Sequence, residues 1–293
     1  MVLGRHDDNL YQLQCSADGR WLATASGDDT AALWDLRTRQ RHATLEHEGP
    51  VYSAVFAPDG KHLVTGSGDG FVTCWSVPDG RKTAAVKKHG DAVYSVAFSP
   101  DGKRLASVGG NGVEGDHIVR VWNTADWTVT AELEGHTMTV YGAVFSPDGA
   151  ILATTSRDKT VRLWRINDGM DQVLEGHTSD VYRGAFSPDG RWLATASQDT
   201  TVRVWDVRTG RCRATLPCRR DPTYGAVFSP NGNYLAAVGD DCRLRVWRVS
   251  DLQAVFEERL SREALYSLTF STDGSTILVG GADANITLHT MPP

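Results

Sequence analysis

The sequence predicts an all-β protein in the form of a seven-bladed β-propeller, and two repeated features lead to that prediction. A turn phrase close to FSPDG returns at residues 56, 98, 145, 186, 228 and 270, with a weaker first copy, CSADG, at residue 15. One Trp, or a His in the last repeat, follows each copy of the phrase as a second landmark. Successive landmarks are 41 to 47 residues apart. That period is the length of one four-stranded blade. The blades are centred on Trp34, Trp75, Trp122, Trp164, Trp205, Trp247 and, in seventh place, His289.

Each repeat has the pattern of short antiparallel strands joined by tight turns. In the fourth repeat the runs VYGAVF, AILATTS and TVRLWRI are separated by the turns SPDG and RDK, a pattern typical of strands. Seven such units close most simply into a ring, because closure leaves only short, protected sheet edges. We therefore expect a single propeller over residues 1–293, with four antiparallel strands in each blade.

The two ends of the chain are expected to meet in the last blade. Met1 to Leu3 align with the fourth strand that precedes the histidine of each repeat, whereas the chain ends after the third strand of the last repeat. Residues near Val2 and Leu3 should therefore complete the seventh blade and close the ring.

The composition argues against nucleic acid and membranes as binding partners. A net charge of −6 and a pI near 5.8 provide no overall basic field to attract nucleic acid or an anionic membrane. The sequence contains no apolar run long enough for a signal peptide or a membrane span. The five cysteines form no CxxC pair, which favours a reducing compartment. We expect a cytoplasmic protein with no cofactor and no metal, and leave its oligomeric state open.

Three kinds of landmark carry a family resemblance. They are the pairs Gly135-His136 and Gly176-His177, the pairs Trp34-Asp35 and Trp205-Asp206, and an Asp six residues before each blade landmark. With these motifs the chain resembles the WD40 family over essentially its whole length. The resemblance implies a hydrogen-bonded tetrad of His, Ser or Thr, Asp and Trp in each of five blades. The matching residues are His6, Thr24, Asp28 and Trp34; His47, Thr65, Asp69 and Trp75; His89, Ser107, Asp116 and Trp122; His136, Thr154, Asp158 and Trp164; and His177, Thr195, Asp199 and Trp205.

The last two repeats depart from the tetrad. The sixth has Arg219 and Ala237 in place of His and Thr, and the seventh keeps only Asp283, with Ser261, Val279 and His289 at the other positions. A buried Asp without its His must find another donor or solvent, since an unpaired buried polar group costs about 1–3 kcal/mol. These two blades are expected to be the least rigid.

Two catalytic interpretations are weaker than their structural counterparts. A Ser or Thr, a His and an Asp together suggest a nucleophilic triad, but a set repeated in five blades is better explained as a device that ties strands together. The glycine-rich stretch Val108 to Gly115 lacks the GK[ST] of a phosphate-binding loop. We interpret it as a longer turn on the face that carries the His loops, where it could border a binding site.

Tyrosine placement is the most distinctive signal in the sequence. Seven of the eight tyrosines stand four residues before the Phe of FSPDG or its equivalent, one in each blade. The resemblance places them at the start of the innermost strand, where they should form an aromatic ring at the mouth of the central channel. Two interpretations stay open, a binding surface or a relic of repeat duplication. The seven are Tyr11, Tyr52, Tyr94, Tyr141, Tyr182, Tyr224 and Tyr266.

Charge on the same face is expected to be uneven. The loops of the first three repeats carry acidic residues (Asp7, Asp8, Glu48, Asp91 and Glu114), whereas those of the later repeats carry Arg157, Arg219, Arg220 and Arg262, with Arg183 next to a ring tyrosine. Scattered surface charge is the commoner explanation of such a distribution. A polarised face would favour an acidic partner segment, bound through Arg157, Arg183 and Arg219.

Two functions follow from these features. The first is a non-catalytic scaffold that binds a protein or peptide on the top face; the nearly verbatim FSPDG copies are similar to bacterial WD40 proteins, in which the propeller often serves as the sensor or interaction module of a larger signalling protein. The alternative is a stand-alone propeller that binds a small molecule, or catalyses a reaction, at the channel mouth with tyrosine hydroxyls, Arg183 and Asp180.

Overall fold

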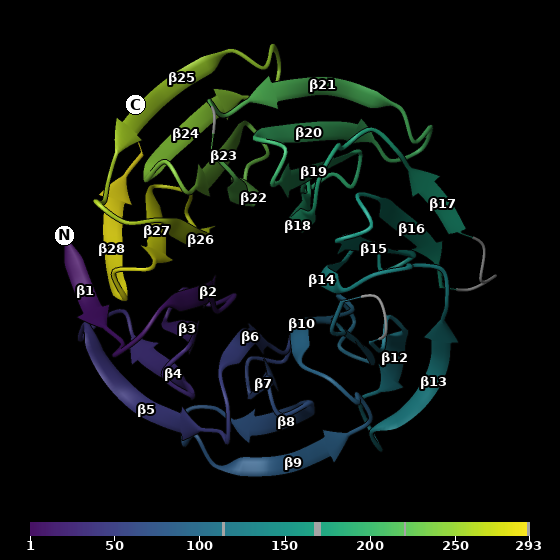
Figure 1. Ribbon diagram of the computed structural model, residues 1–293. Helices are drawn as coiled ribbons and strands as arrows, with labels where there is room; N and C mark the ends of the chain where they lie inside the picture. The colour runs from purple at the N-terminus through teal and green to yellow at the C-terminus, as the bar shows by residue number, and fades with distance from the viewer. Residues whose placement is uncertain (113–114, 167–170, 220, 292–293) are drawn as a thin grey trace.

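The computed structural model describes residues 1–112, 115–166, 171–219 and 221–291. These residues form 28 strands joined by turns and contain no helix, and so no helix that could cross a membrane. The strands make seven sheets, each of four antiparallel strands. Figure 1 shows the sheets as blades around a central opening. The predicted all-β, seven-bladed fold is confirmed.

Blades 1 to 4 follow one another along the chain, each from its innermost to its outermost strand. Blade 1 consists of β2 (Leu10–Cys15), β3 (Trp21–Ser26), β4 (Thr30–Asp35) and β5 (Gln40–Glu46). Blade 2 consists of β6 (Val51–Phe56), β7 (His62–Ser67), β8 (Phe71–Ser76) and β9 (Lys82–Lys87). Blade 3 consists of β10 (Val93–Phe98), β11 (Arg104–Gly109), β12 (Val119–Asn123) and β13 (Thr128–Leu133). Blade 4 consists of β14 (Val140–Phe145), β15 (Ile151–Ser156), β16 (Val161–Arg165) and β17 (Asp171–Leu174).

Blades 5 and 6 repeat this order, and blade 7 takes its outermost strand from the start of the chain. Blade 5 consists of β18 (Val181–Phe186), β19 (Trp192–Ser197), β20 (Thr201–Asp206) and β21 (Cys212–Pro217). Blade 6 consists of β22 (Thr223–Phe228), β23 (Tyr234–Gly239), β24 (Arg243–Arg248) and β25 (Ala254–Arg259). Blade 7 consists of β26 (Leu265–Phe270), β27 (Thr276–Gly281), β28 (Asn285–Thr290) and β1 (Val2–Arg5).

The FSPDG phrase forms the turn between the two innermost strands of a blade. In blade 4 the hydroxyl of Ser146 donates to Oδ1 of Asp148, which also accepts from the amide of Ala150 at 3.0 Å. The amide of Gly149 donates to the carbonyl of Ser146 at 2.8 Å, and Gly149 has a φ of +70°. Because a side chain is strained at such a φ, the phrase ends in glycine.

The ring closes through the N-terminal segment. β1 pairs antiparallel with β28, with Val2 opposite Thr287 and Arg5 opposite Asn285. The amide of Leu288 also donates to the carbonyl of Met1 at 2.8 Å. In Figure 1 the purple start of the chain lies beside the yellow β28. The predicted closure of the seventh blade by residues near Val2 and Leu3 is consistent with this sheet.

The hydrophobic core lies between the blades, as seven separate apolar clusters. Between blades 4 and 5, for example, Leu163 clusters with Phe186 and Trp205. Between blades 7 and 1, Leu3 clusters with Leu10 and Trp34. A blade alone would therefore expose both faces to water, and each depends on its two neighbours.

We predict that Leu3 contributes to closure through its side chain. Leu3 is 8% exposed, whereas the adjacent Val2 is 59% exposed. Leu3→Ala should lower the free energy of unfolding by about 2 kcal/mol or more, and the matched control Val2→Ala by less than about 0.5 kcal/mol. Denaturant titration measures both values. Equal effects of the two substitutions would contradict the assigned role of Leu3.

Candidate binding face and central channel

Blades 1, 4 and 5 each contain a complete hydrogen-bonded tetrad. In blade 4, Nδ1 of His136 lies 2.7 Å from Oδ2 of Asp158, and its Nε2 lies 2.8 Å from Oγ1 of Thr154. The indole of Trp164 donates to the same hydroxyl at 2.8 Å. The same contacts join His6, Thr24, Asp28 and Trp34 in blade 1 and His177, Thr195, Asp199 and Trp205 in blade 5. These groups bond to one another within the blade, as strand-tying contacts require.

Blade 2 holds only part of its tetrad. Nε2 of His47 lies 3.0 Å from Oγ1 of Thr65, which also accepts from the indole of Trp75 at 2.9 Å. Oδ1 of Asp69 accepts instead from the hydroxyl of Ser67 at 2.6 Å. Burial therefore outweighs the attraction of Asp69 and lowers the pKa of His47 to about 4.

Blade 3 adds an arginine to its tetrad. The hydroxyl of Ser107 lies 2.7 Å from Nε2 of His89 and accepts from the indole of Trp122 at 2.7 Å. The guanidinium of Arg120 pairs with Asp116 and lies 3.0 Å from Nδ1 of His89. Nδ1 of His89 is itself 3.3 Å from Asp116. The sequence resemblance did not indicate this arginine.

The last two blades supply other donors to their turn Asp. In blade 6 the buried Asp241 forms an ion pair with the buried guanidinium of Arg245, from β24. In blade 7, Asp283 accepts from the hydroxyl of Ser261 at 3.2 Å and from the amide of Asn285 at 3.0 Å. His289, in the place of the Trp, lies 2.9 Å from the hydroxyl of Thr287.

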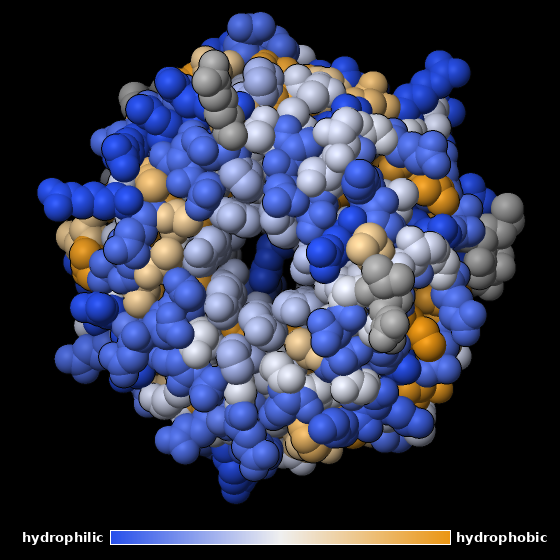
Figure 2. Space-filling view, viewed as in Figure 1, coloured by the Kyte–Doolittle hydropathy of each residue, from blue (hydrophilic) through white to orange (hydrophobic). Residues whose placement is uncertain are grey.

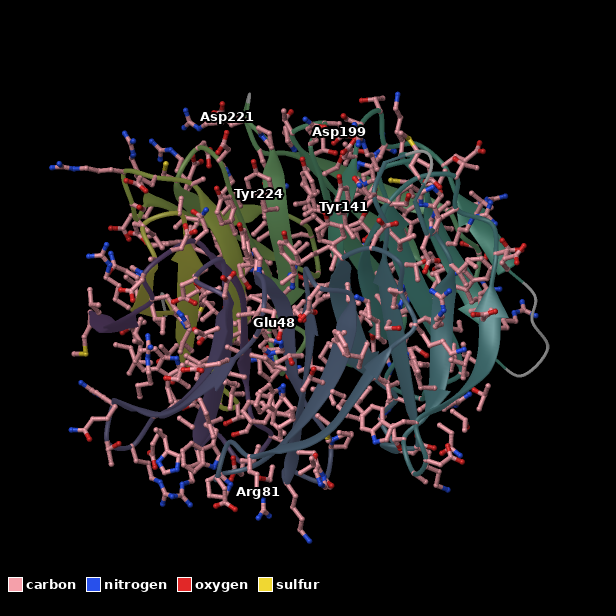
Figure 3. All side chains as sticks on the ribbon, turned by 60° about the horizontal axis from the view of Figure 1, so that its bottom comes forward. Glu48, Arg81, Tyr141, Asp199, Asp221 and Tyr224 are labelled. Atoms are coloured by element: carbon pink, nitrogen blue, oxygen red, sulfur yellow. The ribbon has the colours of Figure 1, made fainter. Side chains whose placement is uncertain are left out.

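The seven repeat tyrosines form a closed ring, called here the tyrosine ring. Each aromatic ring contacts the next, with centroids 4.8 to 6.0 Å apart, and the contact between Tyr266 and Tyr11 completes the circle. All seven side chains are half-buried. Figure 3 shows Tyr141 and Tyr224 toward the end of the propeller that carries Asp199 and Asp221, opposite Arg81. We call this end the tyrosine-ring face; Figure 2 shows the central opening on it, bordered by weakly hydrophilic residues.

The hydroxyls of the tyrosine ring are held in the protonated form. Burial, with nearby carboxylates adding to it, raises the pKa of Tyr141 and of Tyr224 to about 12. Burial also raises the pKa of Tyr52 to about 12. At neutral pH these hydroxyls are hydrogen-bonding groups and not bases, which fits a binding surface better than a reaction centre.

Carboxylates surround the tyrosine ring. Among the described residues, those that raise the pKa of a ring tyrosine through their charge are Asp8, Asp29, Asp91, Asp180, Asp240 and Glu263. Arg157 acts in the opposite direction, since its charge lowers the pKa of Tyr94 and of Tyr141 against the larger effect of burial. The border of the ring is therefore predominantly acidic.

The arginines predicted for this face take different positions. Arg157 is half exposed, with its Nε 3.9 Å from Oδ2 of Asp180. Arg219 donates to Glu257 of the outermost strand β25 at 2.9 Å. Arg183 enters the channel, where its guanidinium donates to the carbonyl of Tyr52 at 3.1 Å. Asp180, the carboxylate named with Arg183 for the alternative function, lies 3.4 Å from the hydroxyl of Tyr141 and near Arg157.

Two of the charges named from the sequence, Glu114 and Arg220, lie outside the described residues. The described part of the glycine-rich insertion packs against blade 4, since the amide of Gly112 donates to the hydroxyl of Thr139 at 2.9 Å. Among the described residues, no group of three or more His, Cys, Asp or Glu side chains could hold a metal ion.

Sequence reasoning missed a set of contacts between neighbouring blades. Side chains on the innermost strands accept hydrogen bonds from backbone amides of the next blade, for example Gln12 from Ala54 and Gln14 from Phe56. The residue after each ring tyrosine could have indicated these contacts. It is Gln or Ser, which can accept a hydrogen bond, in blades 1, 2, 3 and 7, and it is Gly or Arg in blades 4 to 6.

Seven four-stranded blades, several of them tied by a His–Thr–Asp–Trp tetrad, define a WD-repeat propeller. The chain matches the family described as "WD domain, G-beta repeat" over residues 1–35, 39–76, 80–123, 127–165, 170–206 and 210–248. It therefore belongs to the WD40 family. The matched ranges end at residue 248 and so do not include β26, β27 and β28 of blade 7, whose tetrad is the most altered.

One relative has an informative name. A 51-residue stretch is 35% identical to "Target of rapamycin complex subunit wat1" from Schizosaccharomyces pombe. The stretch covers 17% of this chain and 16% of that protein, so the likeness concerns a small part of each. The bacterial character inferred from the FSPDG copies stays a prediction.

The incomplete tetrad of blade 2 generates a pH prediction. The folded-state pKa of His47, about 4, lies below the value near 6.5 of an unfolded histidine, so the unfolded chain binds the proton first as the pH falls. The stability contributed by neutral His47 is present above pH 6.5 and is lost as the pH falls toward 4. Between pH 7 and pH 5 this loss should be about 1–2 kcal/mol.

Denaturant titration at the two pH values checks this prediction. His47→Asn should remove that part of the pH dependence. The control His42→Asn, on the exposed outermost strand β5, should leave it in place. An unchanged pH dependence in His47→Asn would show that other groups cause it.

Proposed function

We propose that the chain is a non-catalytic interaction module that binds a protein or peptide segment on the tyrosine-ring face. The observation that carries the proposal is the closed circle of seven half-buried tyrosines at the channel mouth. WD40 propellers typically serve as interaction scaffolds, and the relative with a shared stretch is named as a subunit of a complex.

The tyrosine ring suits a binding anchor for a physical reason. Tyrosine offers a large apolar area and a polar tip, and its two side-chain torsions cost little entropy when they become fixed. Here each ring packs against two others, which fixes much of that freedom before any partner arrives. A preorganised aromatic surface of this kind binds more tightly, because its side chains lose less conformational entropy when a partner binds.

The charges favour a basic partner segment over the acidic one expected from the sequence. The acidic expectation required Arg157, Arg183 and Arg219 to act together, but Arg219 pairs with Glu257 and Arg183 lies inside the channel. Carboxylates such as Asp180 and Asp240 border the ring. A Lys or Arg side chain would meet both these carboxylates and the faces of the tyrosines, to which cations are attracted.

The remaining parts of the sequence-based hypothesis fit this proposal. A cytoplasmic location and a role as the interaction module of a larger signalling protein stay predictions. The alternative of a reaction at the channel mouth is less favoured, because the tyrosine hydroxyls are protonated and Asp180 contacts Tyr141 and Arg157 instead of Arg183.

Selection of a displayed random peptide library on the purified protein tests the proposal. Selected peptides should be enriched in Lys and Arg. A Tyr94→Ala/Tyr182→Ala variant, shown by its melting curve to be folded, should bind them about 30-fold more weakly or worse, as expected for a hot spot. Full retention of binding by this variant, or the absence of selected peptides, would contradict the proposal.

The neighbours Arg157 and Asp180 provide matched charge variants for the same peptides. Asp180→Asn should weaken the binding of the selected peptides, and Arg157→Gln should strengthen it, because the first removes a carboxylate and the second a competing cation. Isothermal titration calorimetry at two salt concentrations measures both effects. The opposite signs, with peptides rich in Asp and Glu, would restore the acidic partner predicted from the sequence.

A further inference from the structure

The innermost strands of the propeller differ in whether their backbone amides that face the channel donate a hydrogen bond to a side chain of the neighbouring blade. The residue after the ring tyrosine accepts a hydrogen bond from the amide of the next blade at four of the seven interfaces between blades. The pairs are Ser267 with Leu13 at 3.1 Å, Gln12 with Ala54 at 3.1 Å, Ser53 with Val96 at 3.1 Å and Ser95 with Ala143 at 3.3 Å. The amides of blades 1 to 4 at this level therefore have side-chain acceptors.

The equivalent amides of blades 5, 6 and 7 have no such acceptor among the described residues. They belong to Gly184, Ala226 and Leu268, which stand at the same register as the four bonded residues. The positions that would supply the acceptor hold Gly142, Arg183 and Gly225. Neither glycine nor arginine has a side-chain acceptor, so no described side chain of the neighbouring blade accepts from these three amides, and they remain available as donors to a ligand.

Arg183 places its guanidinium across the channel from these three amides. Its side chain starts on β18 of blade 5 and reaches the carbonyl of Tyr52 on β6 of blade 2, so it crosses the channel. A guanidinium has five N–H donors, and this carbonyl is the acceptor that the described residues provide. Among the described residues, no carboxylate forms an ion pair with Arg183. Burial in the channel lowers the pKa of Arg183 to about 10, which leaves it charged at neutral pH.

A cavity of about 470 Å³ adjoins these groups, a size typical of small-molecule sites. Arg183, Gly184, Ala226 and Leu268 all line it, and no Asp or Glu of the described chain does. The cavity continues along the innermost strands to Pro58 and Pro100, in turns at the end opposite the tyrosine ring. A cation without a counter-ion in such a place is costly unless an anion joins it.

We propose that the channel binds a small oxyanion, with carboxylate or phosphate oxygens, between the guanidinium of Arg183 and the amides of Gly184, Ala226 and Leu268. An arginine fork matches two oxygens of such a group, and neighbouring backbone amides add further donors. The ligand enters from the end opposite the tyrosine ring. This site is separate from the peptide surface proposed above, and either proposal can fail without the other.

The test uses inorganic phosphate and malonate as probes of the two oxyanion classes, with chloride at matched ionic strength as the control. Isothermal titration calorimetry and the melting temperature should both show binding of at least one oxyanion to the full chain at millimolar concentration, and none of chloride. The preferred probe distinguishes a phosphate site from a carboxylate site.

Two substitutions remove separate donors of the site. Arg183→Gln, which places in blade 5 the residue that blade 1 has at Gln12, should weaken binding at least about tenfold. Gly225→Ser should supply a hydroxyl to the amide of Leu268 and weaken binding several-fold without touching Arg183. The tightest contact of a β-carbon at position 225 would be the flexible end of Leu268 at 3.0 Å, and the carbonyl oxygen of Tyr266 at 3.4 Å is at ordinary contact distance, so this variant should fold.

Arg208→Gln, at an exposed turn of blade 5, is the surface control and should bind as the original protein does. Binding that survives in both Arg183→Gln and Gly225→Ser, or that falls equally in Arg208→Gln, would overturn the proposal. So would the absence of any stabilisation by either oxyanion in the unmodified chain.

Discussion

Packing between neighbouring blades is the interaction on which the rest of this structure depends. Each apolar cluster takes residues from two successive blades, so a blade buries its faces only when the circle is complete. Four residues of β1 provide the last connection, by pairing with β28 at the other end of the chain. The position of every ring tyrosine follows from this closure, because the innermost strands converge on the centre only in a closed ring.

The repeat made most of the fold predictable. The period of the FSPDG phrase and of the landmark Trp residues determined the blade number, and the offset of Met1 to Leu3 indicated which strand closes the ring. The circle of tyrosines could be anticipated because one stands at the same register in every blade. Features that repeat are constrained by symmetry, so a linear pattern is enough to place them.

The features that break the repeat could not be placed in this way. The sequence showed that Arg183 differs from the residues at the same position of the other repeats. The direction of its long side chain could not be predicted, because it depends on the free space around it, and the neighbouring blades have the small residues Gly142 and Gly225 at this position. Asp69 and Asp158 match the same motif, yet Asp69 bonds to Ser67 and Asp158 to His136. Likewise, the pairing of Asp241 with Arg245 requires knowledge of which side chains share a blade face.

The mouth and the interior of the channel consequently offer opposite chemistry. The mouth has tyrosines bordered by carboxylates, which suits a basic segment of a protein, whereas the interior has a guanidinium and backbone amides, which suit an anion. The tyrosine ring comes from a position that is the same in every repeat, whereas the unpaired amides and the guanidinium come from Gly142, Arg183 and Gly225, which depart from the repeat. The tetrads and the FSPDG turns, by contrast, stabilise the individual blades by joining their strands.

Amide hydrogen exchange, resolved by residue with NMR, tests most directly the claim that the channel wall is divided into a satisfied and an unsatisfied half. The amides of Leu13, Ala54, Val96 and Ala143 should exchange slowly in the native state, because side chains accept from them. Those of Gly184, Ala226 and Leu268 should exchange markedly faster in the absence of an oxyanion and slow down when one is added. Uniform protection around all seven blades would contradict the division of the channel wall and the anion site built on it.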